Sequence, residues 1–166
     1  MQLNRKLGAL AVVIAALGAC ATTGGVPPGT PIDQVRQSRP RPQAEHALPG
    51  GGTRLEFNQG TRGKETWMLD FDANGLLVSS TQVLTEFNLR TIMPGMPMAE
   101  LRRQFGEPAD ICSVARPTRQ QVWNYRFVDS DCSWFQVSIA DANQQVVSAS
   151  MGRDPACDVP SDRMSL

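Results

Sequence analysis

The sequence has no excess of charge of either sign, because its 166 residues carry 16 basic and 16 acidic side chains. This balance excludes a disordered polyelectrolyte and a nucleic-acid-binding protein that depends on bulk positive charge. The sequence also has no C-x-x-C pair, no G-x-G-x-x-G and no G-x-x-x-x-G-K, so it lacks the common motifs for zinc and phosphate binding. We therefore expect one compact domain with no cofactor, no metal and no nucleic-acid partner.

Histidine is almost absent, which argues against acid-base or nucleophilic catalysis. A serine or cysteine nucleophile needs a base that a third group orients, and His46 is the only histidine. The proline and glycine content of residues 41–52 predicts a mobile loop with a solvated His46. The carboxylate pairs also lie at strand or loop positions where we expect solvent to surround them: Asp70 with Asp72, and Asp129 with Asp131. The sequence thus predicts no catalytic residue and no enzyme.

No apolar run reaches the roughly 20 residues that a membrane-spanning helix needs. Instead, Arg5 and Lys6 precede a run of ten uncharged residues, 7–16, and Leu17-Gly18-Ala19-Cys20 follows. This order is typical of a secretory signal peptide and resembles the lipobox of bacterial lipoproteins. We expect residues 1–19 to be removed and Cys20 to be acylated; the alternative is an ordinary cleavage site beside a chance cysteine.

The residues after Cys20 predict where such a lipoprotein would be held. Ala21, rather than aspartate, follows the cysteine, and by resemblance to lipoprotein sorting rules this favours the periplasmic face of the outer membrane. Residues 20–28 are small and rich in threonine, glycine and proline, as in a flexible tether. The acyl chains of Cys20 would make membrane lipid the first partner. Residues 158–166 read as a C-terminal tail.

The body of the chain repeats itself at a spacing close to 68 residues. Apolar strand positions match at this spacing: Leu55, Phe57, Trp67, Leu69 and Phe71 fall on Trp123, Tyr125, Phe135, Val137 and Ile139. Small drifts in the spacing are typical of loop insertions between two copies of one unit. We therefore divide the body into residues 29–83, a degenerate copy, and residues 84–157, the better-defined copy.

Each copy reads as a helix followed by three strands. Residues 97–105 place Met98, Leu101 and Phe105 on one helical face. Apolar and polar residues alternate in the segments around Trp123 and Phe135, which predicts strands with one buried face. Turn residues at 72–75 and 141–143 predict a hairpin at the end of each copy. The expected fold class is α+β, with six antiparallel strands covered by helices on one face.

Three cysteines lie in the body of the chain, and an oxidising compartment would favour a disulfide. Counting back from a hairpin turn near Asn143 places Cys132 within reach of Cys157. We therefore predict a Cys132–Cys157 disulfide, with a Cys112–Cys132 bond as the second choice. In the first case Cys112 is left over, either buried or weakly reactive.

Trp134 is placed on the polar side of its strand, because the alternation that buries Phe135 turns Trp134 outward together with Gln136. An exposed tryptophan is typical of a protein-protein interface. We therefore predict that Trp134, Gln136 and Arg126 bind a partner. The alternative is that Trp134 lies on a neighbouring strand or under a loop.

Residues 84–151 contain a series of short motifs in a fixed order: Phe87 to Ile92, Pro94-Gly95-Met96, Leu101, Phe105-Gly106-Glu107-Pro108, Trp123-Asn124-Tyr125 and Phe135 to Ile139 ending in Asp141. In this order they resemble a known family, the SmpA/OmlA (BamE-like) outer-membrane lipoproteins. The additional N-terminal copy and the cysteines of the body depart from that family's layout.

The resemblance implies a lipid-anchored scaffold protein without catalysis. Its expected partners are components of the β-barrel assembly machinery, and its expected role is to support outer-membrane protein assembly and envelope integrity. Tandem units of this kind also resemble the β-lactamase inhibitor protein family, so inhibition of a hydrolase is the alternative function.

Overall fold

The computed structural model describes residues 25–60, 63–114 and 119–157, and these form two antiparallel sheets of four strands each with few helices. Cys20 and the predicted signal peptide lie outside the described residues, as does the predicted C-terminal tail, residues 158–166. None of the helices in the described ranges is long and apolar enough to cross a bilayer.

The first half of the chain contains one helix and the first sheet, whose strands are ordered β1-β2-β3-β4. Its elements are α1 (Ile32–Ser38), β1 (Ala44–Ala47), the 3-10 turn η1 (Pro49–Gly51), β2 (Thr53–Gln59), β3 (Glu65–Phe71) and β4 (Leu77–Gln82).

The second half contains two helices and the second sheet, ordered β5-β6-β7-β8. Its elements are α2 (Glu86–Leu89), α3 (Met98–Phe105), β5 (Asp110–Val114), β6 (Gln120–Arg126), β7 (Ser133–Ala140), β8 (Gln145–Arg153) and the 3-10 turn η2 (Pro155–Cys157). Thr85 begins α2, because its side chain accepts a hydrogen bond from the backbone of Asn88 at 3.2 Å.

The mixed α and β class with antiparallel strands is confirmed, but the expected three strands per copy are wrong. Each sheet has a fourth strand, β1 or β5, that precedes the three expected ones. These two strands are short, with four and five residues, and neither carries an apolar alternation long enough to identify it in the sequence.

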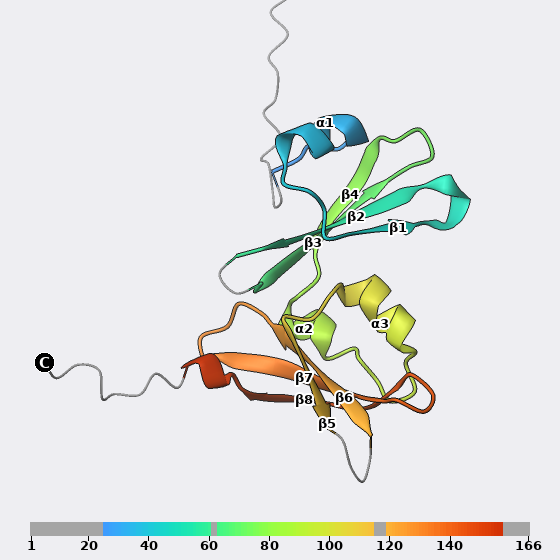
Figure 1. The fold of residues 1–166 in the computed structure, drawn as a ribbon. Helices are drawn as coiled ribbons and strands as arrows, with labels where there is room; N and C mark the ends of the chain where they lie inside the picture. Colours follow the sequence, from blue (N-terminus) through green and yellow to red (C-terminus); the bar gives the residue numbers. More distant parts are fainter. Residues whose placement is uncertain (1–24, 61–62, 115–118, 158–166) are drawn as a thin grey trace, which may run out of the picture.

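Helices and sheets alternate as layers: α1, the first sheet, the pair α2 and α3, and the second sheet (Figure 1). The first sheet therefore lies between α1 and the helices of the second half. Its α1 side is buried around Val35 of the helix and an apolar set from the strands: Leu55, Phe57, Trp67, Leu69, Phe71 and Leu77.

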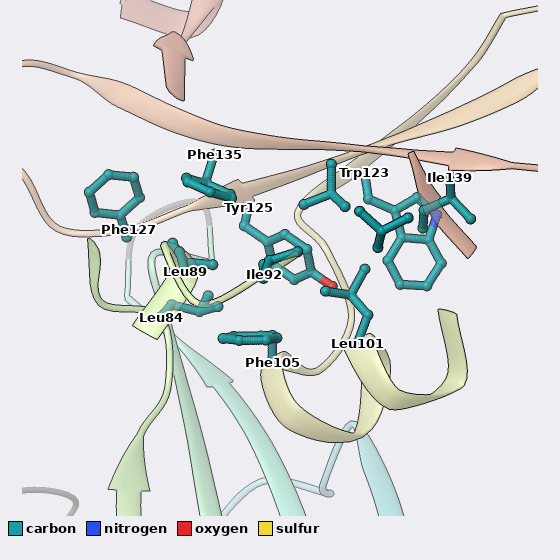
Figure 2. Packing of buried hydrophobic residues seen from close by; sticks show 12 residues of the cluster. Leu84, Leu89, Ile92, Leu101, Phe105, Trp123, Tyr125, Phe127, Phe135 and Ile139 are labelled. Atoms are coloured by element: carbon teal, nitrogen blue, oxygen red, sulfur yellow. The ribbon is translucent and has the colours of Figure 1, made fainter. Parts of the chain in front are cut away.

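The larger core lies between the helices of the second half and the second sheet. Leu89 of α2 and Leu101 and Phe105 of α3 face side chains of β6 and β7 (Figure 2). The strand side chains in this core include Trp123, Tyr125, Phe135, Val137 and Ile139. The positions predicted to be apolar and buried in the second copy are therefore the core positions.

The opposite side of the first sheet is buried by the second half of the chain. Glu56, Thr66 and Met68 on this side are at most 1% exposed. The Glu56 carboxylate accepts a hydrogen bond from the backbone N–H of Glu107 at 3.0 Å, so a buried charge of the first sheet is bonded to the turn after α3. The expectation that helices cover only one face is therefore wrong for this sheet.

Arg54 adds a second connection between the halves. Its guanidinium donates to both carboxylate oxygens of Asp70, at 2.6 and 2.8 Å, and to the backbone carbonyl of Arg103 in α3 at 3.1 Å. Both side chains of the Arg54–Asp70 pair are about four-fifths buried, at 22% and 19% exposure. A paired charge that also bonds a helix carbonyl fixes the orientation of α3 on the sheet.

Equivalent backbone hydrogen bonds are found in both halves. Gly29 N–H donates to the carbonyl of Leu77 at 2.7 Å, and Gly95 N–H donates to that of Val146 at 2.8 Å. In each half the segment before the helix is thereby attached to the first residues of the last strand.

The strand registers of the two halves also correspond. Leu55 is opposite Leu69 in the first sheet, and Trp123 is opposite Val137 in the second, which are the positions matched at the spacing of 68. Irregularities in the last strand pair occur at corresponding places as well, after Asp70 in β3 and after Ser138 in β7.

Tyr125 is the only tyrosine of the chain, and its hydroxyl donates to the carbonyl of Gly106 at 3.1 Å inside the core. Burial, with a smaller contribution from the negative charges of Glu107 and Glu56, strongly raises the pKa of Tyr125 above its ordinary value of 10.0. The neutral phenol therefore contributes stability that is complete below pH 10 and is lost as the pH rises further.

We expect no phenolate absorbance from the folded chain when the pH rises through 10, and we expect the signal to appear only with alkaline unfolding. The measurement is a spectrophotometric titration followed in parallel by circular dichroism, with a titration in denaturant as the control for an exposed tyrosine. A phenolate signal near pH 10 from a chain with native circular dichroism would contradict the burial of Tyr125.

Candidate functional site

The second sheet has one side that no described residue from another layer covers, and we call this side the open face. Side chains of all four strands contribute to it, and those discussed below are Asp110, Cys112, Asn124, Arg126, Trp134 and Gln136. The open face corresponds to the side of the first sheet that the second half of the chain buries. It contains all three residues predicted to bind a partner.

A row of polar side chains crosses the middle of the open face. Asn124 donates to Asp110 at 3.1 Å and accepts from the amide of Gln136 at 3.1 Å. These bonds satisfy both ends of the Asn124 amide, which explains how an amide that is 1% exposed can lie in the sheet without cost. No sequence pattern indicates that Asn124 is buried, because only its neighbours in the sheet determine its burial.

Trp134 lies at one end of this row and is half-buried rather than fully exposed. The guanidinium of Arg126 lies 5.8 Å from the centre of the Trp134 ring, a cation-π geometry. On the other side Trp134 is opposite Gly152 of β8, and a Cβ at this glycine would lie 3.3 Å from the indole nitrogen. Trp134 is therefore on the predicted face, but it rests on its neighbouring strands, as the alternative interpretation expected.

Arg126 is oriented by a carboxylate that the sequence analysis missed. Its guanidinium donates to both oxygens of Asp154, at 2.5 and 3.2 Å, and Asp154 is 2% exposed. Hydrogen bonding to Asp154 raises the pKa of Arg126, so its charge is retained. Because the guanidinium is held on Asp154, Trp134 and Arg126 form a rigid pair.

A disulfide joins Cys132 to Cys157, the pair favoured from the sequence, with 6.3 Å between their Cα atoms. It connects the start of β7 to the turn after β8, beside Asp154. Cys132, Asp154 and Cys157 each offer a ligand atom within 4.8 Å of the others, a cluster that could hold a metal only after reduction. The disulfide uses both sulfur atoms, and Arg126 occupies the carboxylate.

Cys112 is a free cysteine and is exposed, so the expectation that it is buried is wrong. Its thiol donates to Asp110 at 3.3 Å, and this hydrogen bond and the negative charge raise the pKa of the Cys112 thiol. A raised pKa lowers the thiolate fraction at neutral pH, so Cys112 is a weak nucleophile. The expected weak reactivity agrees with this arrangement.

His46 does not lie in a solvated loop, and that prediction is wrong. It belongs to β1, its side chain is 20% exposed, and its Nε2 lies 3.4 Å from the buried carboxylate of Glu56. Of the proline and glycine residues that suggested a loop, Pro49, Gly50 and Gly51 form the short turn η1, between β1 and β2. His46 therefore has a structural partner on the side of the first sheet that faces α3.

The paired carboxylates also have structural partners rather than only solvent. Asp70 binds Arg54, and Asp72 accepts hydrogen bonds from the backbone of the turn that follows it, which lower its pKa. Asp129 accepts from the backbone of Ser133 at 2.9 Å, whereas Asp131 is exposed. Asp131 also accepts a hydrogen bond from the hydroxyl of Ser130 at 3.2 Å. These arrangements fit turn formation and ion pairing.

Comparisons with known proteins add no identity. No family model matches the sequence, and no curated protein matches it significantly. Among the solved structures, a cysteine-rich secretory protein from Staphylococcus aureus subsp. aureus Mu50 matches with 11% sequence identity and a TM-score of 0.29. The match covers 77% of this chain and 44% of that protein, so this chain spans less than half of the other. A TM-score this low supports no inference about fold or function.

Proposed function

We propose that this protein is a lipid-anchored periplasmic interaction protein of the outer membrane, held there by acylated Cys20, and that it binds other proteins through its second sheet. The lipobox Leu17–Cys20 supports the location. The resemblance of residues 84–151 to the SmpA/OmlA family supports a role beside the β-barrel assembly machinery, in outer-membrane protein assembly and envelope integrity.

The observation that carries the proposal is the difference between the two sheets. The side of the first sheet opposite α1 is buried by the second half of the chain, including Glu56, Thr66 and Met68. The corresponding side of the second sheet is the open face, which carries Trp134 and Arg126. A surface that binds a protein layer in one half is thus available to another protein in the other half.

The two sheets correspond to each other in their strand order and registers. We infer that the halves, residues 29–83 and 84–157, are tandem copies of one unit, a helix followed by an antiparallel sheet. The equivalent backbone hydrogen bonds of Gly29 and Gly95, and the matching registers of Leu55 and Trp123, support this inference. In repeat proteins the interfaces between neighbouring units contribute much of the stability, so each unit has a surface that packs against a protein layer.

The test is affinity purification of the full-length chain from membranes, with a Trp134→Ala variant. We expect barrel-assembly subunits to co-purify with the unchanged chain, and recovery to fall by about tenfold or more with Trp134→Ala, the effect of removing a central aromatic contact. Trp134→Phe should retain much of the binding. Val78→Ala is the matched control, because Val78 is an exposed side chain on β4 of the first sheet.

Two outcomes would contradict the proposal. A soluble hydrolase recovered at one copy per chain would favour the inhibitor alternative instead. Detection of Cys20 without fatty acid by mass spectrometry would contradict the lipid anchor. A Cys20→Ser variant should lose its membrane association, because it has no thiol to acylate.

A further inference from the structure

A second surface of the chain is rich in apolar side chains and lies beside β8, away from the open face. It is a groove of about 400 Å³ between the loop after α2, which contributes Ile92, Met93 and Pro94, and the side chains of β8. Arg90 also lines the groove, and its guanidinium lies 3.2 Å from the sulfur of Met151. Met93 is 63% exposed, Val147 45% and Met151 37%. We call this surface the edge groove. Large apolar side chains gathered at one exposed place are typical of binding surfaces.

The edge groove runs along an unprotected sheet edge. β8 is the outermost strand of the second sheet and, with nine residues, the longest strand among the described residues. It has no proline, and no charged side chain occurs from Gln145 to Gly152. Natural edge strands are normally shortened or carry charges or proline that prevent pairing with another chain. The edge strand β1, for comparison, has four residues and includes Glu45.

Pairing along this edge has already begun within the chain. Gly95 N–H donates to the carbonyl of Val146 at 2.8 Å, and Val146 N–H donates to that of Met96 at 2.9 Å. Pro97 and Gln145 form an antiparallel bridge at the same place. From Val147 to Gly152 no described residue continues this pairing, so the backbone groups on the outer edge of β8 are available to a further strand.

We propose that an extended segment of a partner protein pairs with the outer edge of β8, antiparallel to it, and places apolar side chains in the edge groove. The partner segment continues the ladder that Gly95 and Met96 begin. It is about six residues long, and apolar residues occupy every second position, because alternate side chains of a strand point to the same face. This surface is separate from the open face, and the inference needs the proposed function only in treating the chain as a binding protein.

The probe is a set of fluorescently labelled peptides of about eight residues in which valine or leucine alternates with serine, added to the full-length chain in detergent. We expect measurable binding by fluorescence anisotropy. Two further peptides carry N-methyl groups on the backbone. The first is methylated at every odd-numbered residue and the second at every even-numbered residue. Because only one set directs its N–H groups toward β8, one methylated peptide should bind at least about tenfold more weakly and the other should bind normally.

Variants of the chain locate the binding. Met151→Lys places a second positive charge in the edge groove, beside Arg90, and should weaken peptide binding by about tenfold or more. Val78→Lys is the matched control, because Val78 is an exposed valine on the edge strand of the first sheet, and it should leave binding unchanged. Trp134→Ala should also leave peptide binding unchanged, which separates this inference from the proposed function.

Several results would overturn the inference. These are an absence of peptide binding at concentrations up to about 1 mM, equal binding of both methylated peptides, and binding that Met151→Lys does not alter. A dimer of the chain that Met151→Lys dissociates, measured by light scattering, would assign the edge to a second copy instead. None of these results affects the affinity purification that compares the unchanged chain with Trp134→Ala. The proposed function is therefore tested independently of this inference.

Discussion

Replacement of Gly106 by alanine should lower the free energy of unfolding by about 4 kcal/mol, a sum of backbone strain and a displaced buried carboxylate. Gly106 ends α3 with φ 77° and ψ −165°, a conformation that other residues rarely adopt. An added Cβ would lie 2.6 Å from Oε1 of Glu56 and 3.0 Å from a methyl group of Thr66. Glu56 is fully buried and cannot move aside without losing its hydrogen bond to Glu107.

Two comparisons separate the strain from the contact. Gly95→Ala is the matched control, because Gly95 also has a positive φ, 88°, but has no atom within 4 Å of an added Cβ. Gly95→Ala should lower the free energy of unfolding by about 1 to 2 kcal/mol. In a chain that already carries Glu56→Ala, Gly106→Ala should cost no more than this control. Denaturant unfolding measures the four variants and the unchanged chain, and equal losses for Gly106→Ala and Gly95→Ala would show that the contact with Glu56 is unimportant.

Replacing both Cys132 and Cys157 by serine should lower the free energy of unfolding by about 3 kcal/mol, in the chain-entropy model for a closed loop of this length. The disulfide joins residues 25 apart in the sequence and encloses all of β7 and β8. Without it the unfolded chain gains conformational freedom. The end of β8 also loses the connection that holds Asp154 near Arg126.

Cys112→Ser is the control for this double variant. Cys112 is exposed and free, so its replacement should change stability by no more than about 0.5 kcal/mol. Reduction of the unchanged chain with dithiothreitol should reproduce the loss of the double variant. If reduction left the unfolding midpoint unchanged, the disulfide would have no stabilising role.

The second half of the fold could be predicted well from the sequence because its strands alternate strongly. Trp123, Tyr125 and Phe135 are buried where the alternation places them, and the turns at 72–75 and 141–143 connect the expected strands. The short strands β1 and β5 could not be predicted, since neither has an apolar pattern of its own. Each is defined by pairing with a longer neighbour, which a local pattern does not contain.

Burial of polar side chains was the main feature that sequence patterns could not provide. Glu56 and Thr66 alternate with apolar residues and therefore read as solvated, yet the second half of the chain covers both. Asn124 is buried by its own hydrogen-bonded neighbours. The same patterns placed Trp134 on the correct side of its strand, but they could not indicate that Arg126 and Gly152 would half-cover it.

The buried bond between Glu56 and the backbone of Glu107 has a consequence for cooperativity. Separating the halves would expose Met68 and Thr66 and would leave the Glu56 carboxylate without its backbone donor, so the first half excised alone would be far less stable than it is in the intact chain. The two sheets should therefore melt in a single transition despite having separate cores. Cleavage of the connection between β4 and α2 should yield an associated pair of fragments rather than two independent domains.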